Sequence, residues 1–369
     1  MKIDEIEVFH VKMPLVRPYR VSFGKEAVVE SILVRMSSGG QNGWGESCPL
    51  GEPVYSGEYA GGVFAVITKF LAPLLLGQDV RSGAQLQGLL GRFRGNRFAK
   101  AGLDHAWWDL HARMAGVPLW QAIGGQHGTV DVGAAFGIQD SIDELLRLIG
   151  GAVEAGFKRV KLKCAPGWDV DMLAAVRKAF PDATIHVDCN SVYTLADLDT
   201  LKKFDAFDLA MIEQPLDHDD LIDHATLQQK IATPICLDES VVSLDTARKA
   251  IQIGSCRWVN IKPPRVGGLT EAVAIHDLCR DAGIGCWVGG MLESALGEYL
   301  CLALATLDNI KYPSDISASD RFYCPDLSEP PVVLSAPSQV TALDAPGLGS
   351  NPNPDRLAAQ TVSKARLSN

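Results

Sequence analysis

Five charged residues recur between positions 163 and 262 at nearly constant spacing. The intervals are 25, 25, 25 and 24 residues, and the positions are Lys163, Asp188, Glu213, Asp238 and Lys262. Each residue closes a short apolar run typical of a strand, at 158–163, 184–188, 209–213, 234–238 and 258–262. A strand, a helix and their connections take about 25 to 30 residues in a repeating βα unit. The spacing therefore predicts that these side chains converge at the carboxyl-terminal face of a (β/α)₈ barrel, where such folds carry their active sites.

A single Asp or Lys after a strand has an ordinary explanation as a helix cap or a surface charge. Caps use Ser, Thr and Asn as readily as Asp, whereas the three central positions here are all acidic. Five separate caps do not explain one shared register. The pattern favours a joint functional role for all five side chains.

The three acidic positions, Asp188, Glu213 and Asp238, offer only oxygen ligands. Such a set suits Mg²⁺ or Mn²⁺ and disfavours zinc. Lys163 precedes the acidic strands and Lys262 follows them, so the two lysines flank the predicted metal from opposite sides. This arrangement suits removal of a proton next to a carboxylate. The metal and one lysine neutralise the enediolate, and the other lysine transfers the proton.

A free lysine has a pKa of about 10.4 and is a poor base at neutral pH. Lys161 lies two residues before Lys163 in the same strand, so both side chains face the same side. We expect Lys161 and the nearby dication to depress the pKa of Lys163 and make it a competent base.

Composition limits the classes of partner. The 369-residue chain has a net charge of −10, which argues against nucleic acid, and no apolar run of about 18 residues predicts a membrane span. The start, MKIDEIEVFH, lacks the features of a signal peptide. The nine cysteines form no C-x-x-C pair, which favours reduced thiols. We expect a cytoplasmic homo-oligomer that acts on a small carboxylate substrate.

The pattern of predicted strands and helices changes near residue 125. Residues 1–125 carry alternating strands at 3–11, 28–36 and 43–47, followed by helical patterns at 60–76 and 98–116. This order predicts an α+β capping domain, completed by about 325–369. Residues 126–324 alternate between strand and helix from 130–138 onward, with a seventh strand at 284–290 and an eighth at 311–317. The predicted fold class is α/β: a modified (β/α)₈ TIM barrel with an N-terminal α+β capping domain.

Several motifs give the chain a resemblance to a known family. The K-x-K pair at 161–163, the three acidic ligands and N-I-K-P at 260–263 resemble the muconate-lactonizing-enzyme branch of the enolase superfamily. The stretches at 98–110, 116–125 and 346–357 extend the likeness over most of the chain. Within that branch, residues 52–59, 289–294 and 315–323 are similar to the o-succinylbenzoate synthase/N-succinylamino acid racemase group.

The resemblance implies roles for particular residues. It implies a Mg²⁺ enzyme in which Lys163 is the acid/base and Lys262 faces the substrate from the other side, with Asn190 and Glu239 in supporting positions. It also implies that cap loops near Phe23 and Tyr55 cover the substrate and set its identity. The remaining substrate contacts implied by the matching motifs are Ala135, Gly290, Met291 and Asp315.

The chain departs from the group at two places. Ala135 stands where relatives often have Ser, and Ala295–Glu298 stands where they commonly read G-x-G-R. We expect Ala135 to remove a polar substrate contact and Glu298 to alter packing or an interface. Arg265 has three open interpretations: it lowers the pKa of Lys262, binds a substrate carboxylate, or is a surface residue of a βα loop.

Two reactions fit this set of residues. The first is that of o-succinylbenzoate synthase, the syn loss of water from a cyclohexadiene carboxylate in menaquinone biosynthesis. The second is racemisation of N-succinyl or other N-acylamino acids. Another cycloisomerase or epimerase of the branch fits less well, since an Asp-x-Asp motif typical of dipeptide epimerases is missing from the eighth strand. A non-catalytic barrel-shaped binding protein is disfavoured because all five charged positions are intact.

Overall fold

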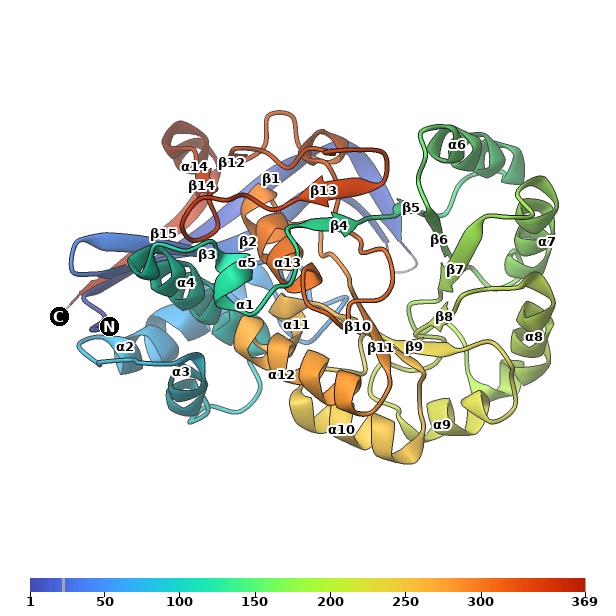
Figure 1. Cartoon of the computed structure of the whole chain (residues 1–369), viewed down its shortest axis with the longest axis horizontal. Coiled ribbons are helices and arrows are strands. Elements are labelled where there is room, and N and C mark those ends of the chain that lie inside the picture. The colour runs from blue at the N-terminus through green and yellow to red at the C-terminus, as the bar shows by residue number, and fades with distance from the viewer. Residues whose placement is uncertain (22–23, 369) are drawn as a thin grey trace.

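A computed structural model describes residues 1–21 and 24–368. A strand-rich layer covers one side of a curled parallel sheet that is ringed by helices (Figure 1). The predicted modified barrel with a capping unit is therefore confirmed. None of the helices in the described ranges is long and apolar enough to cross a membrane.

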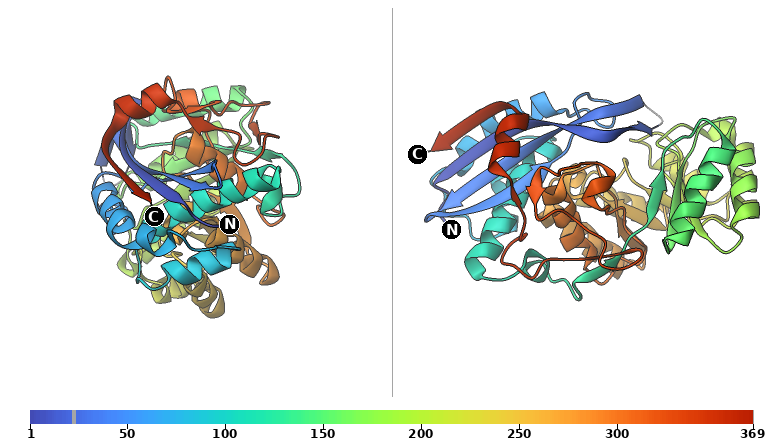
Figure 2. Two further views of the ribbon diagram at one scale, coloured as in Figure 1. Left: turned by 90° about the vertical axis from the view of Figure 1, so that its left-hand side faces the viewer. Right: turned by 90° about the horizontal axis from the view of Figure 1, so that it is seen from above.

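The cap is built on an antiparallel sheet with strand order β15-β1-β2-β3. Its strands are β1 (Glu5–Val21), β2 (Gly24–Ser38), β3 (Gln41–Ser47) and β15 (Thr361–Ser368). The β1–β2 hairpin is long and reaches towards the barrel mouth, as the view from above shows (Figure 2). Because β15 pairs with β1, the end of the chain lies in the same sheet as its beginning.

One face of this sheet packs on a long helix because glycine allows it to come close. A Cβ atom on Gly45 would lie 2.5 Å from backbone atoms of Ala106 and Gly102, so only glycine fits. The helices of this half, which include one π-helical turn, are α1 (Ala60–Val66), η1 (Ile67–Leu71), α2 (Ala72–Leu75), α3 (Gly83–Leu90), α4 (Arg97–Ala115) and α5 (Leu119–Ala122).

The barrel half contains parallel strands in sequential order. In the described ranges they are β5 (Ala134–Phe136), β6 (Arg159–Lys163), β7 (Thr184–Asp188), β8 (Ile212–Glu213), β9 (Ile235–Leu237), β10 (Trp258–Ile261) and β11 (Gly285–Val288). The helices that follow or join them are α6 (Ile142–Glu154), α7 (Asp169–Ala179), η2 (Leu195–Asp197), α8 (Leu198–Lys203), η3 (Phe204–Phe207), α9 (Ile222–Gln228), α10 (Leu244–Ile253), α11 (Pro263–Val266), α12 (Leu269–Asp281) and α13 (Ala295–Ala305). The apolar inner faces of these elements form the core.

The eighth barrel position is irregular, so the strand predicted at 311–317 is wrong. Isolated bridges join Ile310 to Cys286 and Ser314 to Val132, which place this segment between β11 and the start of the barrel. Pro313 supplies no backbone N–H to a ladder. Its carbonyl instead accepts a 2.7 Å hydrogen bond from Nη2 of the fully buried Arg159. A buried guanidinium thus closes the barrel where a strand would otherwise do so.

The rest of the chain returns from the barrel to the cap. Its elements are η4 (Ser319–Arg321), β12 (Ser328–Glu329), β13 (Gln339–Thr341), β14 (Asn351–Pro352) and α14 (Pro354–Gln360), which leads into β15. β13 pairs with the short β4 (Thr129–Asp131) at the start of the barrel half. The tail therefore contacts both halves before it ends in the cap sheet (Figure 1).

Candidate active site

The strand register brings the five predicted residues to one end of the barrel. Lys163 pairs with Asp188 across β6 and β7, and Asp188 pairs with Glu213 across β7 and β8. Glu213 then pairs with Cys236, two residues before Asp238. Residues two apart face the same side of a strand, so each acidic side chain still points inward despite the stagger.

The carboxylates are buried and meet the lysines directly. Lys161 Nζ lies 2.9 Å from Asp188 Oδ2 and 2.8 Å from Glu213 Oε2, and also 3.1 Å from Asp315 Oδ2. Lys163 Nζ lies 2.7 Å from Asp188 Oδ2. The Lys161 charge is therefore compensated by three carboxylates. The expectation that Lys161 and a dication together depress the pKa of Lys163 stays a prediction.

These ion pairs determine the ionisation of Asp188, Glu213 and Lys161. Burial and mutual repulsion tend to raise the pKa of Asp188, but the lysines hold it below its usual range. Burial likewise opposes ionisation of Glu213, whose pKa Lys161 holds well below the usual range. Burial also tends to lower the pKa of Lys161, yet its carboxylate partners raise it well above normal. All three groups are charged at neutral pH.

The acidic set fits a hard divalent cation in its chemistry. Asp188, Glu213 and Asp238 are each at most 1% exposed. Glu213 Oε2 and Asp238 Oδ2 lie 2.8 Å from the ammonium groups of Lys161 and Lys262. Buried carboxylates that offer only oxygen ligands suit a hard cation.

A second acidic group meets a purely geometric criterion for a metal. In the described ranges, only Asp217, His218 and Asp219 bring three ligand atoms within 4.8 Å of one another. All three are exposed, and exposed acidic groups commonly lie this close without an ion. The sequence did not single out this group, which lies in the loop after β8.

Lys262 occupies the other side of the centre and contacts the cap. Its Nζ lies 2.8 Å from Asp238 Oδ2 and 3.2 Å from the Tyr55 hydroxyl. The same nitrogen lies 4.7 Å from the centre of the Tyr55 ring. Although burial tends to lower the pKa of Lys262, the Tyr55 oxygen and the Glu239 carboxylate raise it. Tyr55 is thus a polar partner of the barrel lysine as well as part of the cap.

Arg265 is buried, so its interpretation as a surface residue is wrong. It is 2% exposed, forms an ion pair with Asp238, and donates a 3.0 Å hydrogen bond to the Val241 carbonyl. Its Nη2 donates to the Asn260 carbonyl at 2.5 Å. These protein partners occupy its donors, and Arg265 is not among the described residues that line the cavity. Arg265 therefore holds the Asp238 side chain in place through this ion pair.

The two supporting residues link neighbouring strands. Asn190 Oδ1 accepts a 2.7 Å hydrogen bond from Lys163 Nζ, and Asn190 Nδ2 donates to Glu239 Oε1 at 3.1 Å. Its φ of 43° lies in the left-handed region, which Asn tolerates better than most residues. The Asn190 side chain therefore orients the Lys163 ammonium and carries the network to Glu239.

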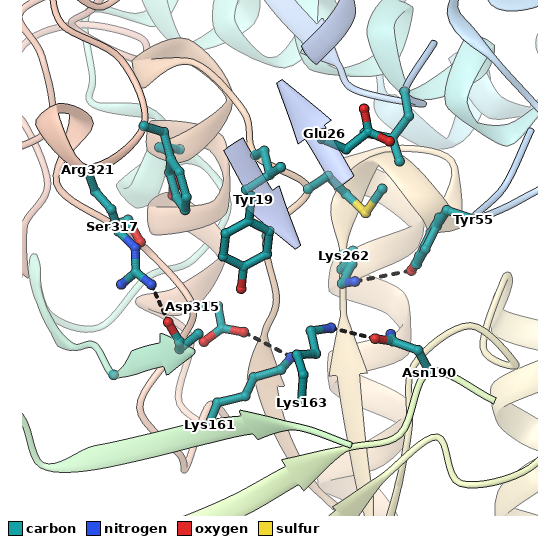
Figure 3. A pocket seen from close by; sticks show the side chains of 18 residues that line it. Tyr19, Glu26, Tyr55, Lys161, Lys163, Asn190, Lys262, Asp315, Ser317 and Arg321 are labelled. Atoms are coloured by element: carbon teal, nitrogen blue, oxygen red, sulfur yellow. Dashed lines mark hydrogen bonds and ion pairs between the residues drawn. The ribbon is translucent and has the colours of Figure 1, made fainter. Parts of the chain in front are cut away.

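A cavity at the mouth of the barrel collects most of the predicted residues (Figure 3). It is lined by the three lysines and by predicted substrate contacts from both halves, namely Lys161, Lys163, Lys262, Asn190, Tyr55, Ala135, Gly290, Met291 and Asp315. Asp188, Glu213 and Asp238 are not among the described residues that line it. The predicted contact Phe23 lies outside the described residues.

Other residues of the lining were not predicted. Tyr19, Glu26 and Leu50 enter from the cap, and Ser317, Arg321 and Phe322 come from the segment after the eighth barrel position. Tyr19 and Glu26 lie at the ends of β1 and β2, close in the chain to the predicted contact Phe23, and Arg321 belongs to the 315–323 motif, so both stretches carried a signal. Glu298, for which we expected a packing or interface role, also lines the cavity.

Comparisons with known proteins agree with this architecture. Residues 3–124 match the N-terminal domain of the mandelate racemase/muconate lactonizing enzyme family, and residues 144–356 match the enolase C-terminal domain-like family. The chain is 45% identical over 350 residues to o-succinylbenzoate synthase of Geobacillus kaustophilus, covering 95% of this chain and 93% of that protein. It is 43% identical over 365 residues to N-succinylamino acid racemase of an Amycolatopsis species, covering 99% of both.

A solved structure has the same fold as this chain. An enolase superfamily member from Listeria innocua superposes with a TM-score of 0.96 at 35% identity, covering 100% of this chain and 99% of that one. Such coverage includes both the cap and the barrel. The chain therefore belongs to the enolase superfamily, in its muconate-lactonizing-enzyme branch, and it is an enzyme.

Proposed function

We propose that this enzyme depends on Mg²⁺ and removes a proton from the carbon next to a substrate carboxylate. Its reaction is most simply that of an o-succinylbenzoate synthase, the syn loss of water that ends in an aromatic ring. The observation that carries this proposal is the placement of Lys163 on β6 and Lys262 after β10, which enter one cavity from opposite sides of the buried carboxylates. The 45% identical Geobacillus relative bears the name of this synthase.

The metal belongs to the proposal. Enzymes of this superfamily combine a lysine or histidine base with Mg²⁺. Asp188, Glu213 and Asp238 would hold the ion, which would supply positive charge to the carboxylate as the neighbouring proton leaves. Asn260 Nδ2 donates a 2.7 Å hydrogen bond to Glu213 Oε1 and fixes the orientation of that ligand.

The chain's own groups then perform the proton transfers. Neutral Lys163 accepts the proton from the carbon, and the C–H electron pair passes into the enediolate. The Lys163 ammonium next gives the same proton to the leaving hydroxyl on that face. The C–O electron pair departs with water as the ring double bond forms. Lys262 stays protonated on the opposite face and stabilises the negative charge of the intermediate.

A second candidate reaction is racemisation of N-succinyl or other N-acylamino acids. The opposed lysines favour it, because one residue can remove a proton from one face and the other can return a proton to the opposite face. The Amycolatopsis relative with this activity in its name is similar over nearly the whole chain. Both reactions begin with the same proton abstraction and differ in which lysine completes the turnover.

Single substitutions of the two lysines separate the reactions. In a synthase, Lys163→Ala should abolish dehydration, and Lys262→Ala should lower kcat by about 10²- to 10³-fold, as removal of one charge stabiliser typically does. In a racemase, either substitution should block interconversion while proton exchange into D₂O persists for the enantiomer that faces the remaining lysine. Loss of the ultraviolet signal of the diene and NMR of the α proton measure the two outcomes.

A matched control is Lys158→Ala. Lys158 precedes β6, is exposed, and pairs with Asp131 at 2.7 Å outside the cavity. It should retain dehydration and exchange. Dehydration and exchange by Lys163→Ala at the rate of the unaltered protein would show that Lys163 is not the base.

A further inference from the structure

The loop that follows β11, residues 289–292, meets both the cavity and Lys262. Its contribution to the cavity lining is Gly290, Met291 and Leu292. The Gly289 N–H donates a 3.2 Å hydrogen bond to the Ile261 carbonyl at the end of β10. A Cβ atom on Gly289 would lie 2.8 Å from Lys262 Cε, so the loop packs directly against the stem of that lysine. The position of this loop therefore limits where the Lys262 side chain can lie.

Three side chains from different parts of the chain bind the backbone of this loop. Glu293 Oε2 accepts a 2.6 Å hydrogen bond from the Met291 N–H. The Met291 carbonyl accepts a 3.0 Å hydrogen bond from the thiol of Cys48, which lies in the cap just after β3. The Leu292 carbonyl accepts a 2.7 Å hydrogen bond from the Tyr323 hydroxyl. The loop is therefore held by the cap and by two separate segments of the barrel half.

The backbone of Leu292 shows that these contacts hold the loop in an unusual conformation. Its φ is 64°, in the left-handed region that a bulky residue other than glycine rarely adopts. Such a conformation persists only where the surrounding structure fixes it, and it is frequent at functional sites. We therefore regard the hydrogen bonds to Met291 and Leu292 as the groups that fix the loop.

The cap holds the same region at a second point. Glu46, two residues before Cys48, accepts a 3.2 Å hydrogen bond from the Ser294 N–H and a 2.9 Å hydrogen bond from the Gly297 N–H. Both donors lie at the start of α13, directly after the loop and Glu293. Glu46 and Cys48 are fully buried. The end of β3 thus contacts the loop and the helix that follows it.

We propose that Glu293 and Cys48 are positioning residues for Lys262. Through the 289–292 loop they fix where its ammonium group lies, so that the position of the cap on the barrel affects one side of the reaction. The inference rests on the proposed function, in which Lys262 and Lys163 approach the substrate from opposite sides. Displacement of the loop should therefore impair the Lys262 side selectively.

The Lys163 ammonium group is held by other residues. Its Nζ donates 2.7 Å hydrogen bonds to Asp188 Oδ2 and to Asn190 Oδ1. Asp188 ends β7, which is separated from β11 by β8, β9 and β10 in the sheet. The groups that orient Lys163 are therefore on the far side of the sheet from the loop after β11.

Proton exchange on the two faces of an N-succinylamino acid tests the proposal. The readout is the face ratio, which is the rate of α-proton exchange on the Lys262 face divided by the rate on the Lys163 face. NMR in D₂O with Mg²⁺ present measures both rates. A misplacement of about 1 Å can cost about 10²-fold in rate, so Glu293→Leu should lower the face ratio by about 10- to 100-fold. A general loss of stability slows both faces alike and leaves the face ratio unchanged.

Two milder variants accompany Glu293→Leu. Cys48→Ala removes one hydrogen bond from the Met291 carbonyl and should lower the face ratio by about two- to tenfold. Glu293→Gln should keep most of the face ratio, because its amide oxygen can still accept the Met291 N–H bond. Cys48→Ala carries the test by itself where Glu293→Leu does not fold.

Matched controls come from the other end of the barrel strands. Cys256 is a buried thiol just before β10, and Gln228 Oε1 accepts a 2.7 Å hydrogen bond from the Ile235 N–H at the start of β9. Cys256→Ala and Gln228→Leu remove groups of similar burial that are remote from the 289–292 loop. Both variants should leave the face ratio unchanged.

The outcomes separate this inference from the proposed function. A face ratio that Cys48→Ala and Glu293→Leu leave unchanged would overturn the inference. Absence of exchange on both faces in the unaltered protein would count against the proposed function instead. Hydrogen-exchange mass spectrometry then tests the inference without turnover. The backbone amides of 289–292 should exchange faster in Glu293→Leu and Cys48→Ala than in the two controls, and equal rates would overturn the inference.

Discussion

The sharpest test of how the cap takes part in the chemistry is Tyr55→Phe. The Tyr55 hydroxyl lies 3.2 Å from Lys262 Nζ, 3.1 Å from Asp238 Oδ1 and 3.4 Å from Arg265 Nη1. It donates to the carboxylate and accepts from the two cations. Phenylalanine keeps the ring, whose centre lies 4.7 Å from Lys262 Nζ, and removes only the oxygen.

The expected magnitude follows from these contacts. A hydrogen bond to a charged group contributes about 1.5–3 kcal/mol net, so loss of the hydroxyl should lower the rate of the step that uses Lys262 by about 10- to 150-fold. The contacts share one oxygen, so their contributions are not additive. The cation–π contact of about 0.5–2 kcal/mol remains in Tyr55→Phe and is lost in Tyr55→Leu, which should be slower still.

Proton exchange on the two faces of the substrate gives an internal control. Each enantiomer of an N-succinylamino acid presents its α proton to one lysine, and NMR in D₂O follows the two separately. Tyr55→Phe should slow proton exchange on the substrate face that Lys262 approaches by about 10- to 150-fold. Proton exchange on the face that Lys163 approaches should slow by much less. An equal loss on both faces would show that Tyr55 acts through Asp238 and the metal. A change below about twofold on either face would refute the role of the hydroxyl.

Three further predictions concern the metal and the stability of the fold. Glu213→Gln should abolish activity and weaken Mg²⁺ binding in calorimetry while circular dichroism stays unchanged; full activity after EDTA treatment would contradict the metal assignment. Gly45→Ala should lower the free energy of unfolding by about 1–3 kcal/mol, because its Cβ would meet the backbone of α4. Gly88→Ala lies on an open helix surface and should raise the free energy of unfolding by about 0.5–1 kcal/mol. Urea unfolding measures both changes. Although burial opposes it, Arg159 holds the pKa of Asp315 well below its usual range, so Asp315 stabilises the fold above about pH 4 and loses this contribution as pH falls. Asp315→Asn should flatten the acid limb of the stability curve, and an unchanged limb would speak against the pair.

The register of the site could be predicted because it depends on local periodicity. Parallel strands joined by helices of similar length repeat at a fixed interval, and their carboxyl ends meet at one edge. The observed pairing of Lys163 with Asp188 and of Asp188 with Glu213 reproduces that interval in space. The same periodicity could not predict that the eighth barrel position is irregular. Its residues read as a strand in the chain, but Pro313 and the long-range bond from Arg159 decide its geometry.

Long-range electrostatics could not be predicted from spacing alone. Lys161 and Lys163 share a face, as the strand period requires, but the sequence does not reveal that three carboxylates surround Lys161. Arg265 is in a loop that usually faces solvent, and its burial depends on Asp238 from the neighbouring unit. In both cases the sequence identified the charged residue, and the packing of separate βα units determined its partner.

Side chains from both halves of the chain line the cavity. The resemblance to the family implied that cap loops near Phe23 and Tyr55 set the identity of the substrate. The lysines and the three buried carboxylates occupy the arc from β6 to β10, and the segment 310–315 closes the barrel in the opposite arc. Glu298 and Arg321 lie in that arc and belong to the barrel half of the chain, while Tyr19 and Tyr55 reach the cavity from the cap. Groups that can contact a substrate therefore come from the cap and from the barrel half alike, so the cap loops alone do not form the lining of the cavity.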